Sequence, residues 1–234
     1  GLVGANGAGK STTIKLILNL IRRDAGSIRL FGLDNIEQET AVKKRIGVVF
    51  DEPCFHDVLA PRQIGRDMKG LYADWDDQAF AGYLRDFSLP ENKIVKEFSR
   101  GMKMKLAIAA ALSHHPDLLI LDEPNSGLDP LVRDEILDIF LDFLQDETRA
   151  VILSSHITSD LEKIADYVAF MKDGRMVFQE EKDVLLSGCG MNAPEPTQPP
   201  VRQITMVVDE QSILDLEQRY PDLEEVNLTG SECY

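Results

Sequence analysis

The chain has 234 residues, of which 44% are hydrophobic and 28% charged, and this fits one globular domain with at most a small appendage. Its formal net charge of -15 makes nucleic acid an unexpected partner, because a phosphate backbone needs clustered lysine and arginine. No apolar run in the sequence reaches the length of a membrane span, so we expect another polypeptide to supply any membrane part. The cysteines, Cys54, Cys189 and Cys233, are far apart and are expected to be free thiols.

The first predicted elements are a helix and two strands. Apolar residues at helical spacing predict a helix over 10–21. A short strand is predicted over 27–31, and a β-branched apolar run predicts a buried strand over 46–50. From 53 to about 113 the pattern becomes mainly helical. Because the chain opens three residues before a glycine-rich loop, we expect the strand that leads into that loop to be truncated at its N-terminus.

Strand signals return in the second half of the chain. Apolar runs predict strands over 118–121 and 150–153, with an amphipathic helix over 131–144 between them. Asp173-Gly174 lies between two further apolar runs and predicts a hairpin. Strands that alternate with helices predict an α/β fold, a mainly parallel sheet flanked by helices. The long helical segment before them is expected to form an α-helical subdomain inserted into this fold.

The composition changes after Leu186. We expect residues 187–203, which are rich in glycine, proline and asparagine, to form a linker. Residues 204–234 are expected to form a small C-terminal extension with one strand and one helix. Nothing in the sequence assigns this extension a role.

A glycine-rich octapeptide, Gly4-Ala-Asn-Gly-Ala-Gly-Lys10-Ser11, fully matches the phosphate-binding pattern G-x-x-x-x-G-K-[ST]. Its glycines allow a tight turn that points backbone N–H groups at an anion, and the following helix adds its positive N-terminal end. Lys10 is placed to reach the β- and γ-phosphates of a nucleotide, and the Ser11 hydroxyl is placed to ligate Mg²⁺. The residues predicted to bind the nucleotide here are Gly4, Asn6, Gly7, Ala8, Gly9, Lys10, Ser11 and Thr12.

The apolar strand predicted over 118–121 ends in two acids, Asp122 and Glu123. We expect this strand to lie beside the one that leads into the phosphate loop, so that Asp122 holds Mg²⁺ opposite Ser11. Glu123 then faces the γ-phosphate and polarises an attacking water as a general base. The alternative is a strand that ends in a solvated acidic turn, and the phosphate loop upstream makes that alternative weaker.

Three further segments resemble the ATP-binding subunits of ABC transporters. Phe98-Ser-Arg-Gly-Met102 is similar to the signature motif, Pro124-Asn-Ser-Gly-Leu-Asp129 to the D-loop, and Ser154-Ser-His156 to the end of the switch-histidine strand. With the phosphate loop and the acidic strand they follow the order of that family over residues 1 to about 186. The resemblance implies a P-loop NTPase fold of the RecA-like type. It also implies ATP hydrolysis that powers export through separate transmembrane permease subunits.

The resemblance also implies the roles of individual residues. Two ATP molecules would lie in the interface of a head-to-tail homodimer or heterodimer, each held by one subunit's phosphate loop and by Ser99 and the Gly101 backbone of the other. Glu123 would be the general base, His156 would hold the γ-phosphate and water, and Asp129 would link the two sites. The subunit would be cytoplasmic, bound through the permease to the inner face of the membrane.

Two residues depart from the family pattern. Asp51 stands where the family has the Q-loop glutamine, and it remains a candidate ligand of the nucleotide and of Mg²⁺, although it is shorter and charged. Arg100 replaces the first glycine of the signature and adds bulk and positive charge near phosphate. Together with the run from Asp51 to His56 they resemble a bacterial ABC-2-type exporter branch. That branch includes the phenol-soluble modulin exporter and bacitracin-type resistance ATPases.

Two other functions remain open on the sequence. The first is a non-transport ABC ATPase, such as a translation factor or a chromosome-organising protein. A translation factor would carry two ATPase domains, whereas this sequence contains one. A chromosome-organising protein would carry a long coiled coil between the phosphate loop and the signature, and that interval contains no heptads. The second is a regulator that binds ATP without hydrolysing it, and Glu123 and His156 argue against it.

Overall fold

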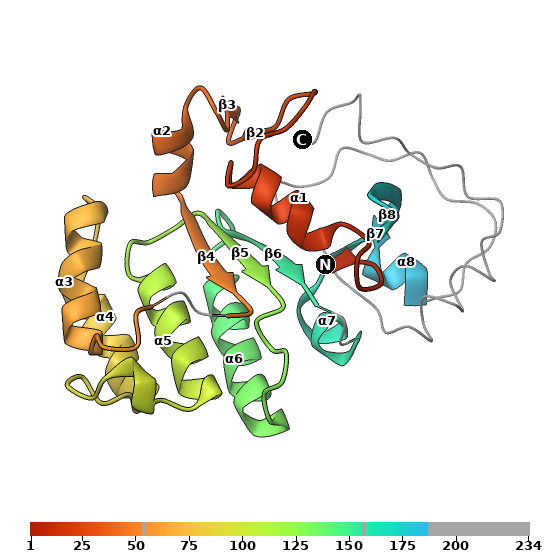
Figure 1. Cartoon of the computed structure of the whole chain (residues 1–234). Coiled ribbons are helices and arrows are strands. Elements are labelled where there is room, and N and C mark those ends of the chain that lie inside the picture. The colour runs from red at the N-terminus through yellow and green to blue at the C-terminus, as the bar shows by residue number, and fades with distance from the viewer. Residues whose placement is uncertain (53–54, 156–157, 187–234) are drawn as a thin grey trace.

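A six-stranded sheet forms the centre of the protein (Figure 1). The structure is a computed structural model that describes residues 1–52, 55–155 and 158–186. The strand order is β4-β5-β6-β1-β7-β8, and only the β7–β8 pairing is antiparallel among the described strand pairs of this sheet. The mainly parallel α/β fold that the sequence predicts is therefore confirmed. The strands of this sheet are β1 (Leu2–Val3), β4 (Ile46–Phe50), β5 (Leu118–Asp122), β6 (Ala150–Ser154), β7 (Tyr167–Lys172) and β8 (Arg175–Glu181).

Helices cover both faces of this sheet. In Figure 1, α1 and α2 lie above it and α5, α6 and α7 lie below it. None of the helices within the described ranges combines the length and the apolar character needed to cross a bilayer. A small second sheet pairs β2 (Arg29–Leu30) with β3 (Leu33–Asp34). The helices are α1 (Lys10–Ile17), α2 (Glu39–Lys44), α3 (Pro61–Leu71), α4 (Asp77–Asp86), the 3-10 helix η1 (Val95–Glu97), α5 (Arg100–Leu112), α6 (Pro130–Phe143), α7 (Thr158–Ile164) and α8 (Lys182–Leu186).

Strand β5 is buried along its whole length because both of its faces are covered. Leu118 and Ile120 join the apolar cluster that includes Ile14 of α1. Leu119 and Leu121 point the opposite way and pack in the larger cluster with α5, α6 and α7. Successive side chains of a strand alternate between faces, so a strand between two helical layers has to be apolar at every position. Burial on both faces therefore explains the continuous apolar run over 118–121 that predicted this strand.

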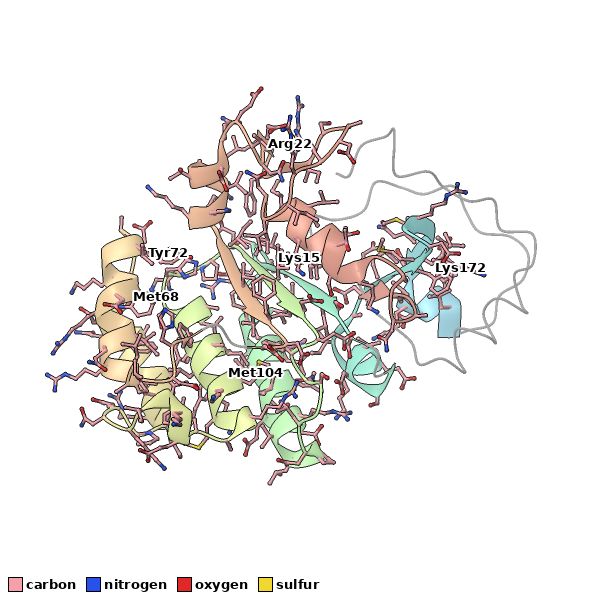
Figure 2. The ribbon with its side chains drawn as sticks, in the orientation of Figure 1. Lys15, Arg22, Met68, Tyr72, Met104 and Lys172 are labelled. Carbon is pink, nitrogen blue, oxygen red and sulfur yellow. The ribbon has the colours of Figure 1, made fainter. Side chains whose placement is uncertain are left out.

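Between β4 and β5 the chain forms a separate group of helices with its own apolar cluster. Residues of α3, α4, η1 and α5 pack there around Phe80 and Trp75. Helix α5 belongs to two clusters at once: Leu106 faces the helical group, whereas Met104 packs in the cluster under the sheet (Figure 2). The long helix thus joins the helical group to the sheet, and its N-terminal end carries the segment that resembles the signature.

The expected position of β5 beside the phosphate-loop strand is wrong. Strand β6 lies between β1 and β5 and pairs with both, with Ser154 in register with Leu2 on one side and with Asp122 on the other. Parallel strands are joined by long crossovers, and such a connection does not reveal where the next strand enters the sheet. The chain leaves β5, runs through α6 and returns into this inner position. Strand β6 ends in a small buried residue, Ser154, and Ser155 directly after it is buried as well.

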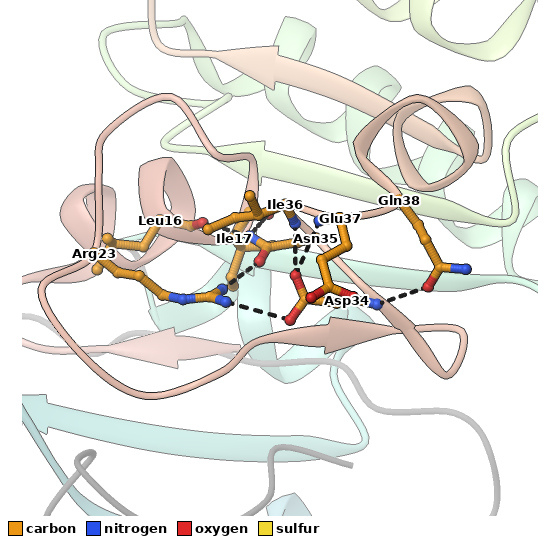
Figure 3. Close-up of polar contacts among 8 residues, drawn as sticks. All are labelled: Leu16, Ile17, Arg23, Asp34, Asn35, Ile36, Glu37 and Gln38. Atoms are coloured by element: carbon orange, nitrogen blue, oxygen red, sulfur yellow. Dashed lines mark hydrogen bonds and ion pairs between the residues drawn. The ribbon is translucent and has the colours of Figure 1, made fainter.

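Helix α1 ends earlier than the predicted 10–21, because the backbone of Asn19 turns into the left-handed region with a φ of 52° and Asn35, which follows β3, bonds the last carbonyl groups. The Asn35 amide donates hydrogen bonds to the carbonyl oxygens of Leu16 and Ile17, at 2.8 and 2.9 Å (Figure 3). Arg23 in turn donates to the Asn35 amide oxygen at 2.6 Å and to Asp34 at 3.2 Å. The network fixes the C-terminal end of α1 to the β2–β3 hairpin, so the phosphate-loop helix is held at both ends.

Candidate nucleotide-binding site

A pocket of about 320 Å³ lies where the loop after β1 meets the carboxyl ends of β4 and β5. In open α/β sheets, ligands bind outside the carboxyl ends of the strands. The pocket brings together eight of the residues predicted from the sequence, and it adds Ser126, which sequence reasoning missed. The residues that line it are Asn6, Gly7, Gly9, Lys10, Ser11, Thr12, Asp51, Glu123 and Ser126.

The phosphate loop is fixed by backbone contacts and by glycine at its junction with α1. Gly9 is the N-cap of α1 and has a φ of 107°, a left-handed value that a side chain would strain. The N–H of Gly174, in the β7–β8 turn, donates to the carbonyl oxygen of Ala8 at 2.9 Å. The Ala8 N–H donates to the Ala5 carbonyl oxygen at 3.0 Å, which closes the turn. The loop therefore has a defined shape before any ligand is bound.

Lys10 is buried at the first position of α1, with only 5% of its surface exposed. Its ammonium group donates to the carbonyl oxygens of Gly4 at 2.7 Å and of Ala5 at 3.3 Å, and it lies 3.9 Å from the Glu123 carboxylate. Burial lowers the pKa of Lys10, while the charges of Glu123 and Asp122 raise it. A bound polyphosphate would add negative charge and favour the charged lysine further.

The acidic residues at the end of β5 reach the start of α1, although β6 lies between β5 and β1 in the sheet. The Ser11 hydroxyl donates to Asp122 Oδ1 at 3.1 Å. Glu123 follows with a φ of 52°, and its N–H donates to the Ser154 carbonyl oxygen at 2.8 Å. A left-handed backbone is uncommon outside glycine and is found often at functional sites. This conformation turns the chain at the strand end, and Glu123 lines the pocket.

The donor set of Ser11 and Asp122 fits Mg²⁺. Both side chains offer oxygen atoms, the ligands that this cation prefers, and Asp51 presents another carboxylate to the same pocket. Across the part of the chain that the structure describes, histidine, cysteine, aspartate and glutamate form no group of three or more arranged to hold a metal ion. A cation bound by one or two side chains that takes its remaining ligands from water and phosphate is the mode typical of Mg²⁺.

The residues similar to the signature and the D-loop lie elsewhere. Ser99 is the N-cap of α5 and accepts a hydrogen bond from the Met102 N–H at 3.2 Å. Asp129 caps α6 in the same way, with the Val132 N–H at 3.1 Å. Ser99, Asp129 and Gly101 are not among the described residues that line the pocket. His156, the predicted switch histidine, lies outside the described residues.

A buried polar network that the sequence analysis missed holds the segment after Glu123. The Asn125 amide donates to Asp160 Oδ2 at 2.9 Å, and Arg133 donates to Asp160 Oδ1 at 2.8 Å. Asn125 and Asp160 are each only 1% exposed. The network joins the D-loop-like segment and α6 to α7. Nothing in the local sequence marks Asp160, because a buried carboxylate is recognised only through its partners.

Replacing Asp160 by alanine is expected to destabilise the protein strongly. The change removes the acceptor of the buried Asn125 amide and the carboxylate partner of Arg133, which keeps only its bond to Ser159, and breaking a buried ion pair typically lowers the free energy of unfolding by about 3 kcal/mol or more. Urea unfolding of the purified variant measures this loss. Asp134→Ala is the control, because Asp134 is an exposed carboxylate paired with Lys163 on the surface. Equal losses in the two variants would contradict a structural role for the network.

Comparison with known proteins gives the family. The model of the family described as ABC transporter matches residues 1–126, more than half of the chain. The chain belongs to the ABC transporter family. This ABC chain is 35% identical over 182 residues to the bacitracin transport ATP-binding protein BcrA of Bacillus licheniformis, an alignment that covers 76% of the chain and 58% of BcrA. The match therefore spans less than two thirds of that relative.

Solved ABC structures agree with the fold. The structure of an ATP-binding subunit of an ABC transporter superposes with a TM-score of 0.70 at 30% identity, covering 80% of this chain and 79% of that chain. A dimeric ATP-binding cassette in a post-hydrolysis state, bound to ADP and Pi, superposes with a TM-score of 0.68 at 20% identity, covering 77% and 83%. The resemblance stated from the sequence motifs is thus confirmed for the family and for its fold.

Proposed function

We propose that the chain is the ATP-binding and ATP-hydrolysing subunit of an ABC transporter and that it powers export through separate transmembrane permease subunits. One observation carries the proposal: the phosphate loop, the buried Lys10 and Glu123 meet at one pocket, and Asp122 accepts a hydrogen bond from Ser11, which lines it. Lys10 lies 3.9 Å from Glu123, and Ser11 lies 3.1 Å from Asp122. These are the groups that bind a nucleoside triphosphate and direct a water at its terminal phosphate.

Each group has a distinct task in this proposal. The loop N–H groups and Lys10 bind the β- and γ-phosphates and orient them. Ser11 and Asp122, with Asp51 nearby, would hold Mg²⁺, which supplies neutralisation of the negative charge on the triphosphate. Glu123 accepts a proton from the attacking water. His156 would contact the γ-phosphate, a role that rests on the resemblance of its segment to the switch-histidine strand.

A second copy is proposed to complete the site. Ser99 and Asp129 are exposed and cap helices outside the pocket, so their polar side chains are available to a facing subunit. In a head-to-tail dimer, Ser99 and the Gly101 backbone would close over the nucleotide bound by the partner. A cassette of the same fold is dimeric with ADP and Pi bound, which supports a dimer; the head-to-tail arrangement rests on the resemblance of the motifs.

The transport role is proposed from the relatives. BcrA is described as a bacitracin transport protein, and the 30% identical solved structure as a subunit of an ABC transporter. We infer from these that this chain serves an exporter as a peripheral subunit on the cytoplasmic face of the membrane. The exported compound would be selected by the permease.

Lys10→Ala tests the nucleotide site directly. Removing the ammonium group eliminates at least one charge-assisted contact to phosphate, so the Kd for Mg·ATP is expected to rise about 10-fold to 100-fold. Isothermal calorimetry on the purified protein measures this change. Lys15→Ala is the matched control, since Lys15 is an exposed lysine of the same helix (Figure 2) and should leave the Kd unchanged. Equal affinity of the Lys10→Ala variant and the parent protein would refute the assignment.

A further inference from the structure

The two residues that depart from the family pattern contact each other. Arg100, at the start of α5, donates a hydrogen bond to Asp51 Oδ1, and the two form an ion pair. Asp51 directly follows β4, so the pair joins the central sheet to the helical group. Two substitutions that look independent along the sequence are therefore one feature of the folded protein.

The guanidinium of Arg100 also covers the D-loop-like segment. A Cβ atom built on Gly127 would lie 3.2 Å from Arg100 Nη1 and 3.3 Å from its Cζ, closer than ordinary van der Waals contact. Gly127 has a φ of 64° and offers a bare backbone on which the planar group rests. One side chain thus contacts the end of β4 and the segment after β5 while it belongs to α5.

The pair matters for the charge of the pocket. Asp51 and Glu123 both line the pocket. Asp122 accepts a hydrogen bond from Ser11, which also lines it. A third carboxylate near a triphosphate repels it unless a cation offsets the charge. Lys10 is already engaged with the loop carbonyls and with Glu123. Arg100 supplies the cation that faces Asp51.

The pair contributes little to folding stability. The side chains of Arg100 and Asp51 are 47% and 44% exposed, and exposed ion pairs typically add less than about 1 kcal/mol. Its effect is therefore expected in the ATP-dependent steps, where the anionic substrate approaches the same carboxylate.

We propose that Arg100 is a positioning residue of the ATPase, which neutralises Asp51 and holds it at the edge of the nucleotide pocket. The proposal rests on the proposed function, because it assigns a task within the same site. With Arg100 present, Asp51 can serve as an oxygen donor at the coupling position without repelling ATP. Without Arg100, the carboxylate is uncompensated and free to turn toward the phosphates.

A double-mutant cycle tests the proposal on ATPase kinetics. Arg100→Gln is expected to raise the KM for ATP about fivefold at low ionic strength, with kcat changed by less than about twofold. The increase should shrink at high salt, where charge repulsion is screened. Adding Asp51→Asn to Arg100→Gln should return KM toward the parent value, because the unpaired charge is then removed. Asp51→Asn alone completes the cycle, and thermal unfolding midpoints should change little in the two single variants and the double variant.

Lys103→Gln is the matched control. Lys103 lies one turn further along α5 and pairs at 3.0 Å with Asp57, another exposed carboxylate of the segment after β4, but neither lines the pocket. Its KM should equal that of the parent. An unchanged KM in Arg100→Gln, or additive effects in the double variant, would overturn the proposal. If the parent protein itself fails to hydrolyse ATP, the proposed function fails instead, which separates the two outcomes.

Discussion

Glu123→Gln is expected to stop ATP turnover while Mg·ATP binding persists. The amide keeps the shape of the side chain and the turn at the end of β5, but it cannot accept a proton from water at neutral pH. General base catalysis typically contributes on the order of 10² to 10⁴ to the rate, so phosphate release should fall by that factor. Single-turnover assays with radiolabelled ATP measure the chemical step, and equilibrium binding of ATP measures its retention.

The change also removes a negative charge beside Lys10, so nucleotide affinity should stay level or increase. ATP-dependent dimers that no longer dissociate should then accumulate in size-exclusion chromatography. Glu135→Gln provides the control, because Glu135 is an exposed glutamate of α6 paired with Lys105 and is absent from the pocket lining. Turnover of Glu123→Gln at the parent rate would show that another group activates the water.

The second large effect is expected from Gly4→Ala. Gly4 directly follows β1 and has a φ of 154°, and an added Cβ would lie 2.6 Å from the Ala8 Cβ and would overlap the carbonyl oxygen of Met171 in β7. Neither atom belongs to a flexible side-chain end, so the loop or the strand must shift. We expect a loss of about 1–3 kcal/mol in the free energy of unfolding, as overpacking usually causes, together with loss of ATP binding.

Gly70→Ala is the comparison for this prediction. Gly70 lies in α3, where an added Cβ would meet open space, and alanine there should stabilise the helix by about 0.5–1 kcal/mol. The same chemical change is thus expected to have opposite signs at the two positions. Chemical denaturation and calorimetric titration with ATP measure both. A Gly4→Ala variant as stable as the parent and able to bind ATP would show that the loop tolerates a side chain.

The sequence predicted best those elements that depend only on residues next to one another in the chain. The apolar run 118–121 predicted a doubly buried strand, and the octapeptide ending in Lys10-Ser11 predicted the phosphate loop, because each depends on neighbouring residues only. The order of the strands depends on where a crossover returns, so the sequence did not reveal that β6 separates β1 from β5. The prediction for the end of α1 was also wrong, since Asn35, whose amide bonds the last carbonyl groups of the helix, comes from a later segment.

The parts of the site that the sequence did not predict depend on polar contacts between residues far apart in the chain. The motifs identified Asp51 and Arg100 separately, but only the fold brings them together, although they are 49 positions apart. Asp160 carried no signal at all, because its significance depends on Asn125 and Arg133 reaching it through the folded core. The sequence identifies the residue types of a site, and the packing of the fold determines which of these residues contact one another.

Helix α5 cannot turn about its own axis without opening one of two apolar layers, because Met104 packs under the sheet and Leu106 among the helices. We therefore expect α5 to move as a rigid unit rather than to bend. A displacement of α3 or α4 is therefore expected to carry the whole of α5 with it, including its N-cap Ser99. In the proposed dimer, such a displacement would also move the residues that face the nucleotide of the second copy.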